Sequence, residues 1–127
     1  MSDTISHGIR FGRIAPTLST RDLDRALAFY VGALGFRVAF RNGDPVGFVI
    51  LRKDDAELHL TLQPRHRASP ANVAHLMVDD VDALHALCKA HGLRIVRGVQ
   101  DKEYGLRAFV FEDPDGNRID VGQRLDL

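Results

Sequence analysis

Disulfides, tryptophan and net charge are what this sequence lacks. Its 127 residues include one cysteine and no tryptophan, and 17 Lys and Arg balance 17 Asp and Glu. A lone cysteine, Cys88, allows no disulfide within the chain, so a reducing cytoplasm is the expected location. Balanced charge gives no positive field for nucleic acid, no apolar run is long enough to span a membrane, and the polar start is unlike a signal peptide. We therefore expect a cytoplasmic protein with no nucleic-acid or membrane partner.

The clearest local signal is a β-hairpin in residues 109–121, Phe-Val-Phe-Glu-Asp-Pro-Asp-Gly-Asn-Arg-Ile-Asp-Val. A three-residue loop, Pro114 to Gly116, suits the turn because proline presets φ and glycine takes the left-handed position. This register places Asp120 beside Val110, on the face opposite the two phenylalanines. An acid on the inner face of a sheet needs a partner, a metal or a ligand. Asp120 is therefore the first candidate functional residue.

The chain also contains an internal repeat. Asp22 and Asp80 are helix N-cap candidates 58 residues apart, and the same shift pairs Ala15 with Val73. A duplicated unit of this size predicts two βαβββ modules that pack together into one α+β domain. The expected boundaries are residues 1–127 for the whole domain, 13–63 for the first module, 64–72 for a linker and 73–123 for the second module.

A second shift, of 61 residues, aligns Phe48-Val49 with Phe109-Val110 and His59 with Asp120. If the hairpin register carries across the repeat, one set of side chains lines a concave face while Phe48 and Ile50 meet the helices. The predicted lining of that concave face is Val49, Leu51, Glu57, His59, Val110 and Asp120.

Three motifs together resemble the vicinal oxygen chelate superfamily, which includes glyoxalases, bleomycin-resistance proteins and extradiol dioxygenases. They are Pro16-Thr17-Leu18-Ser19-Thr20-Arg21-Asp22-Leu23, then Ala28-Phe29-Tyr30 through Leu34-Gly35-Phe36, and Asp113-Pro114-Asp115-Gly116-Asn117. The resemblance covers about residues 14–123. It implies two βαβββ modules curving around a cleft, but one architecture can serve many reactions.

Within that group the sequence is most similar to the bleomycin-resistance type, through its Pro-x-Leu-x-x-Arg-Asp opening, Tyr104-Gly105 and the Asp-Pro-x-Gly-Asn turn. The resemblance implies a metal-independent homodimer that sequesters an antibiotic-like small molecule without chemistry. It also implies that the N-terminal strand crosses to the partner at Pro16. In such a cleft Phe40 and Tyr104 would stack on a flat ligand, while His59 and Asp120 would set the polarity.

Metal-using members of the superfamily place ligands at four strand positions, which here are Ala15, His59, Val73 and Asp120. Two of the four are apolar, and a divalent site normally needs at least three protein ligands, so no metal cofactor is expected. His75 lies two residues beyond Val73 on the same strand face. It could supply a third ligand from a shifted position.

Two enzymatic alternatives and several structural ones stay open. A divalent metal held by His59, Asp120 and His75 would support a glyoxalase- or dioxygenase-like enzyme, and His59 with Asp120 could act as base and acid without a metal. Equally, His59 and Asp120 could form a satisfied polar pair, His75 could be structural, and Glu57 could be a solvated strand-end charge. The candidate ligand-binding residues are His59, Asp120, Phe40, Tyr104, His75, Glu57 and Val49.

Overall fold

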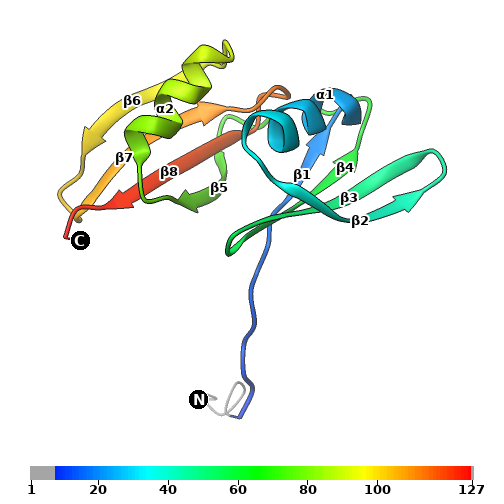
Figure 1. The fold of residues 1–127 in the computed structure, drawn as a ribbon, viewed down its shortest axis with the longest axis horizontal. Coiled ribbons are helices and arrows are strands. Elements are labelled where there is room, and N and C mark those ends of the chain that lie inside the picture. The colour runs from blue at the N-terminus through cyan, green and yellow to red at the C-terminus, as the bar shows by residue number, and fades with distance from the viewer. Residues whose placement is uncertain (1–7, 127) are drawn as a thin grey trace.

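The computed structural model describes residues 8–126, and Figure 1 shows two four-stranded sheets beside each other with an extended N-terminal arm. The first sheet has the strand order β1-β4-β3-β2, and the second repeats it as β5-β8-β7-β6. In each sheet the first strand pairs in parallel with the last, and the other neighbours are antiparallel. The α+β class and the two βαβββ modules are therefore confirmed.

The elements follow in the same sequence in both halves. The first half contains β1 (Thr17–Thr20), α1 (Leu23–Leu27), the π-helical η2 (Ala28–Ala33), β2 (Arg37–Gly43), β3 (Val46–Lys53) and β4 (Ala56–Leu62). The second half contains β5 (Asn72–Met77), α2 (Val81–Ala90), β6 (Ile95–Asp101), β7 (Leu106–Glu112) and β8 (Arg118–Arg124).

Both predicted helix N-caps are confirmed. The side chain of Asp22 accepts a hydrogen bond from the backbone N–H of Arg25 at 3.1 Å, and Asp80 accepts one from Ala83 at 3.0 Å. Each bond satisfies a donor that the first helical turn leaves unpaired. No helix in residues 8–126 has the length and apolar character needed to cross a membrane.

The hydrophobic core lies between the helices and one face of each sheet. Its side chains come from both modules and include the T-shaped pairs of Phe29 with Tyr30 and with Phe111. The largest fully buried core side chains are Tyr30, Phe109, Phe111, Leu51, Leu60, Val49, Val81 and Val121. The opposite face of each sheet carries no helix, and we call these two surfaces the open faces.

The predicted face assignment for the first sheet was wrong by one residue on β3. Val49 pairs with Leu60 and is fully buried on the helix side, whereas Phe48 and Ile50 lie on the open face. The cause is turn length: Lys53 pairs with Ala56 across a two-residue turn, while the corresponding turn of the second sheet has three residues. Because side chains alternate along a strand, one residue moves the whole set to the other face.

The hairpin of the second sheet matches its prediction. Phe109 pairs with Val121 on the helix side, and Asp120 lies beside Val110 on the open face. The turn closes through the N–H of Asp113, which donates to the carbonyl of Asn117 at 2.9 Å, and Gly116 has φ of 82°. This is a three-residue loop with glycine in the left-handed position that disfavours other residues.

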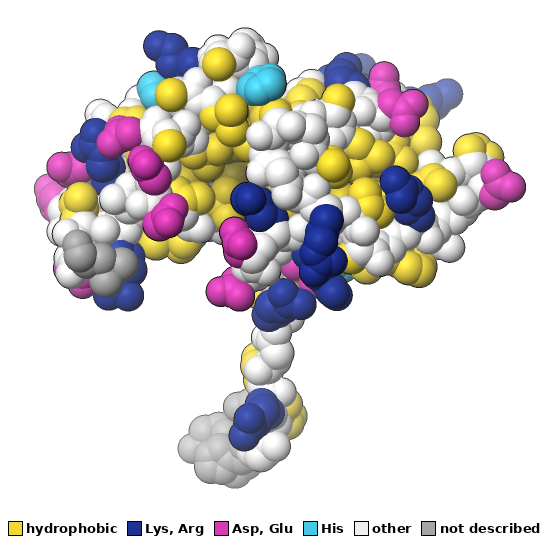
Figure 2. Space-filling view, in the orientation of Figure 1, with side chains coloured by type: hydrophobic (Ala, Val, Ile, Leu, Met, Phe, Trp, Pro, Cys, Tyr) yellow, Lys and Arg dark blue, Asp and Glu magenta, His cyan; other side chains and the backbone are white. Residues whose placement is uncertain are grey.

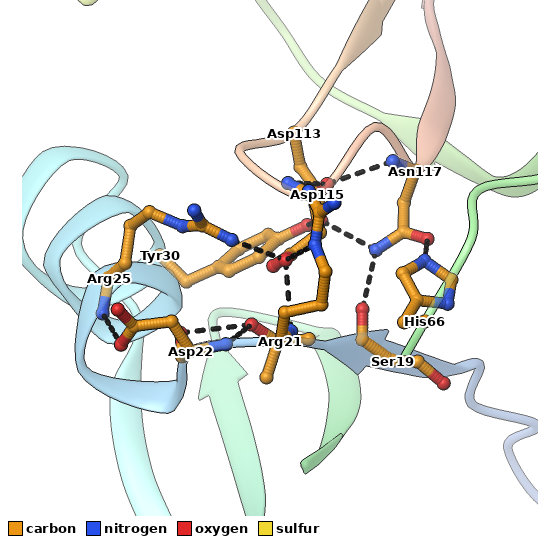
Figure 3. A network of polar contacts seen from close by, with 10 residues as sticks. Ser19, Arg21, Asp22, Arg25, Tyr30, His66, Asp113, Asp115 and Asn117 are labelled. Atoms are coloured by element: carbon orange, nitrogen blue, oxygen red, sulfur yellow. Dashed lines mark hydrogen bonds and ion pairs between the residues drawn. The ribbon is translucent and has the colours of Figure 1, made fainter. Parts of the chain in front are cut away.

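The same turn holds the second module against the first (Figure 3). The hydroxyl of Tyr30 donates to Asp113 at 2.7 Å, and the side-chain amide of Asn117 donates to the carbonyl of Ser19 at 3.0 Å. Arg25 donates to the fully buried carboxylate of Asp115 at 2.6 Å. The Asp-Pro-Asp-Gly-Asn motif is therefore a joint between the modules as well as a turn.

Burial changes the ionisation of this joint. It raises the pKa of Tyr30 well above the ordinary value, with the Asp113 carboxylate adding to the effect. Burial also raises the pKa of Asp113, although its hydrogen bonds from Asn117 and Tyr30 act in the opposite direction. For Asp115 burial again acts upward, but the backbone N–H of Arg21 and the charge of Arg25 help to outweigh it, and the pKa is lowered. Asp115 is therefore held as a carboxylate.

The N-terminal arm continues further along the chain than expected. The first module was expected to begin at residue 13, but its first strand begins at Thr17, and residues 8–16 form no helix or strand. The arm projects away from both sheets in Figure 1, and apolar atoms are visible along it in Figure 2. Its side chains Ile9, Phe11 and Ile14 are 61%, 79% and 98% exposed, so the arm buries almost none of its apolar surface within its own chain.

Candidate functional site

The open face of the second sheet carries a His–Asp pair. Nδ1 of His75 donates to Oδ2 of Asp120 at 2.8 Å, and the other ring nitrogen lies 3.1 Å from the sulfur of Met77. His75 is the β5 residue directly alongside Asp120, whereas Val73, the position at which the resemblance implied a metal ligand, lies two residues earlier in the chain. The carboxylate orients the imidazole, which leaves Asp120 partnered within its own sheet.

The open face of the first sheet carries a different polar group at the equivalent strand position. His59 contacts Glu57 at 2.9 Å, and the other carboxylate oxygen of Glu57 accepts from Arg52 at 2.9 Å and Arg13 at 3.0 Å. The bond with His59, followed by that with Arg52, lowers the pKa of Glu57. Glu57 is therefore tied into a charge network at the base of the arm, and it differs from the lone strand-end charge considered above.

His59 and Asp120 do not pair with each other in the described chain. They lie on separate sheets, and each is hydrogen-bonded to a neighbour on its own sheet. Within residues 8–126, no three His, Cys, Asp or Glu side chains come together in a way that could hold a metal ion. One chain alone therefore does not assemble the donor set of His59, Asp120 and His75.

The two aromatic candidates are both exposed. Phe40 is 50% exposed and pairs with Ile50 on the open face of the first sheet, while Tyr104 is 71% exposed in the loop between β6 and β7. Sequence reasoning missed Phe48, whose ring packs edge-on against His59 with centroids 5.5 Å apart. It was assigned to the core by the same one-residue error that put Val49 on the open face.

A hollow of about 140 Å³ opens beside Asp120 on the second sheet. Tyr104, Val110 and Asp120 line it, as do two basic residues that the sequence analysis did not select, Arg97 and Lys102. Simple alternation would place Arg97 on the helix side with Ile95, but a register shift between them turns Arg97 to the open face opposite Val110. Such a bulge leaves no clear mark in the residue pattern of β6, so sequence alone offered little signal for Arg97.

Two duplicated βαβββ modules, each with one face covered by a helix and one face open and polar, define the class of this protein. The model of the Glyoxalase/Bleomycin resistance protein/Dioxygenase superfamily matches residues 10–121. The chain belongs to this superfamily.

The chain is also similar to individual proteins. An uncharacterised protein of Mycolicibacterium smegmatis is 33% identical over 102 residues, covering 80% of this chain and 84% of that protein. The bleomycin resistance determinant encoded on transposon Tn5 is 27% identical with a TM-score of 0.74, covering 90% of this chain and 98% of that one. A bleomycin-binding protein complexed with bleomycin is also 27% identical, with a TM-score of 0.72 and coverage of 90% and 99%.

Proposed function

We propose that this protein is a metal-independent, antibiotic-like small-molecule binding protein that works as a homodimer. The observation that carries the proposal is the pair of open sheet faces, which combine exposed aromatic rings with a few polar groups. Ligand sites in proteins are typically built this way, from apolar walls and a small number of oriented polar groups. The resemblance to a bleomycin-binding protein over nearly the whole chain supports the same reading.

The size of the hollow argues that one chain supplies only part of the site. Its volume is about 140 Å³, whereas pockets for drug-sized ligands hold roughly 300–1,000 Å³. An additional wall facing Tyr104 and Asp120 would enlarge and enclose it. The open face of the first sheet, with Phe40, Phe48 and His59, offers such a wall if it comes from a second copy of the chain.

The arm supplies the second argument for a dimer. Phe11 and Ile14 are 79% and 98% exposed in the single chain, which is an unfavourable state for large apolar side chains unless another surface covers them. The arm leaves the body at Pro16, whose carbonyl accepts from the N–H of His59 at 2.9 Å beside the open face. A second copy that receives the arm would thus also approach the proposed ligand site.

The oligomeric state tests this arrangement. We expect the full chain to sediment as a dimer, and we expect the Phe11→Ser/Ile14→Ser variant to shift toward monomer because it loses apolar contacts with the partner. Arg10→Ser is the matched control, since it alters the arm without removing an apolar side chain. A monomeric full chain would contradict the dimer, and a dimeric double variant would contradict the role of the arm.

Ligand binding is tested after treatment with EDTA, using the neutral fluorescent aromatic N-phenyl-1-naphthylamine and bleomycin as separate probes. We expect saturable binding of the naphthylamine without metal, weakened about tenfold in Tyr104→Ala and in Phe40→Ala through loss of aromatic contact. Wild-type affinity in both variants would contradict a ligand held between the open faces. Binding of bleomycin would show that the similarity to bleomycin-binding proteins includes binding of the drug itself.

One observation favours a second candidate, a metal-dependent enzyme of the same superfamily. His59 on β4 and Asp120 on β8 occupy equivalent positions, and His75 lies directly beside Asp120 without any change of register. If the open faces of two copies meet, two imidazoles and one carboxylate could face one another, a set that suits a divalent metal. Such an ion would supply Lewis-acid chemistry, while His75 and Asp120 would hold and orient it.

Elemental analysis of the purified dimer separates the two candidates. The binding proposal expects no stoichiometric zinc, nickel, manganese or iron. Stoichiometric metal that disappears in both His59→Ala and His75→Ala, with the dimer intact, would overturn that proposal in favour of the metal-dependent enzyme.

A further inference from the structure

The hollow beside Asp120 has an uneven distribution of charge. Its lining includes two basic side chains, Arg97 and Lys102, and one acidic side chain, Asp120. Asp120 is already engaged by His75 at 2.8 Å. In the part of the chain that the structure describes, neither Arg97 nor Lys102 forms an ion pair, and Lys102 instead donates to the neutral side chain of Gln100 at 2.9 Å. The hollow therefore has two basic side chains and one carboxylate, which gives its lining a net positive charge.

Several other basic side chains on the open faces are paired with an acid: Arg52 pairs with Glu57, Arg118 with Glu112, and Arg124 with Asp126. Arg37, opposite Arg52 on β2, forms no ion pair in the described residues, but it does not line the hollow beside Asp120. Arg97 and Lys102 are distinguished because they lie together at that hollow.

The backbone brings Arg97 into this position. Register shifts on both sides of Arg97 in β6 turn it to the open face, opposite Val110, and Asp120 flanks Val110 from β8. Val110 is 6% exposed and forms an apolar floor between the two charged groups. Tyr104 stands at the side of the hollow, 71% exposed. The site therefore offers an apolar floor, an exposed ring and a guanidinium at one end.

We propose that this hollow is an anion-binding subsite and that the ligand is a flat aromatic molecule with a carboxylate or sulfonate group. The inference rests on the proposed binding function and specifies its ligand class. The guanidinium of Arg97 would receive the anion with two parallel hydrogen bonds, Lys102 would add charge, and the Tyr104 ring would cover the aromatic part. A polycationic ligand would meet Arg97 as a like charge, which favours anionic ligands over drugs of that kind.

Two fluorescent probes that differ by one group test the subsite in the full-length protein. 8-Anilinonaphthalene-1-sulfonate is anionic, and N-phenyl-1-naphthylamine has the same ring system without the sulfonate. We expect Arg97→Gln to weaken the sulfonate probe about tenfold and Lys102→Gln to weaken it about threefold, with the neutral probe changed less than twofold. Arg67→Gln is the matched control, because it removes the same charge from an exposed position outside the hollow.

The outcomes separate this inference from the proposed function. If both probes bind and Arg97→Gln weakens only the sulfonate probe, the subsite is supported. If both bind and Arg97→Gln changes neither, or changes both alike, the subsite is overturned while the binding function stands. If neither probe binds the wild-type protein, or if Tyr104→Ala and Phe40→Ala both leave the binding of each probe unchanged, both proposals fail. An unchanged melting temperature in Arg97→Gln shows that the variant is folded.

Discussion

The two sheets share a backbone plan but have different side chains on their open faces. The register shift that turns Arg97 outward on β6 recurs on β2, where it turns Phe40 outward opposite Ile50. Equivalent positions thus present a ring in one sheet and a guanidinium in the other. The comparison shows that the duplicated framework has been kept while the surface chemistry of its halves has separated.

The charged side chains of the two open faces also differ within a shared plan. On the first sheet Arg52 of β3 pairs with Glu57 of β4 at 2.9 Å, and on the second sheet Glu112 of β7 pairs with Arg118 of β8 at 3.3 Å. Both sheets therefore have an ion pair between equivalent strands, but the acid and the base have exchanged strands. Two copies that bring unlike sheets together would therefore present complementary surfaces to each other.

The largest expected effect comes from breaking the joint that only the second sheet's turn forms. Asp113→Ala removes the acceptor for Tyr30 and for the N–H groups of Asp115 and Asn117, so we expect a loss of about 3 kcal/mol in unfolding free energy. Chemical denaturation of the wild type and the variant measures this difference in unfolding free energy. Asp55→Ala, in the exposed turn of the first sheet, is the control and should stay within about 0.5 kcal/mol. Equal effects at both turns would refute the difference between them.

A smaller effect, with a pH signature, is expected at Asp115. Because its pKa is lowered on folding, the carboxylate stabilises the protein at pH values above its unfolded pKa of about 3.9, and this contribution disappears as pH falls through the folded value. Asp115→Asn should cost about 1–2 kcal/mol at pH 7. The difference between the melting temperatures of wild type and variant should begin to shrink as the pH falls below about 4, and it should vanish once the pH is below the lowered pKa of folded Asp115. A constant difference down to pH 3 would show that the charge of Asp115 is not what stabilises the joint.

The smallest expected effect concerns the inverted ion pair. Exchanging Arg52 and Glu57, as the double variant Arg52→Glu/Glu57→Arg, gives the first sheet the charge order of the second. Since both side chains are partly exposed, we expect a change of less than about 1 kcal/mol in the double variant. Thermal unfolding of the wild type, both single variants and the double variant gives the unfolding free energies for a double-mutant cycle. A large loss in the double variant would mean that His59 and Arg13 require the original polarity.

Features set by local chemistry were predictable from the sequence. The N-caps Asp22 and Asp80 and the Pro114–Gly116 turn depend on neighbouring residues, so their patterns predicted the structure correctly. The duplication and the overall architecture followed from these anchors together with the family resemblance. The joint was missed because its contacts are long-range: Tyr30 and Asp113 are 83 residues apart, and a turn motif does not reveal what the turn touches.

The site was less predictable because it depends on single-residue registers. A turn one residue shorter than expected exchanged the faces on which Phe48 and Val49 lie. Register shifts turned Phe40 and Arg97 to the open faces, and no residue type in these strands predicts such shifts. His75 was considered only as a ligand from a shifted position two residues beyond Val73, whereas it lies directly beside Asp120. The functional roles of His59, Asp120, Phe40, Tyr104, His75 and Glu57 remain predictions for the experiments above.

The joint formed by Asp113, Asp115 and Asn117 has a consequence for how such a protein can change over generations. It connects the halves at the tip of one hairpin, through Tyr30 and the residues around β1, and uses none of the side chains on the open faces. Mutations at Phe40, Arg97 or their neighbours can therefore accumulate without loosening the connection between halves. A chain built this way can acquire a new ligand while its scaffold stays under separate selection.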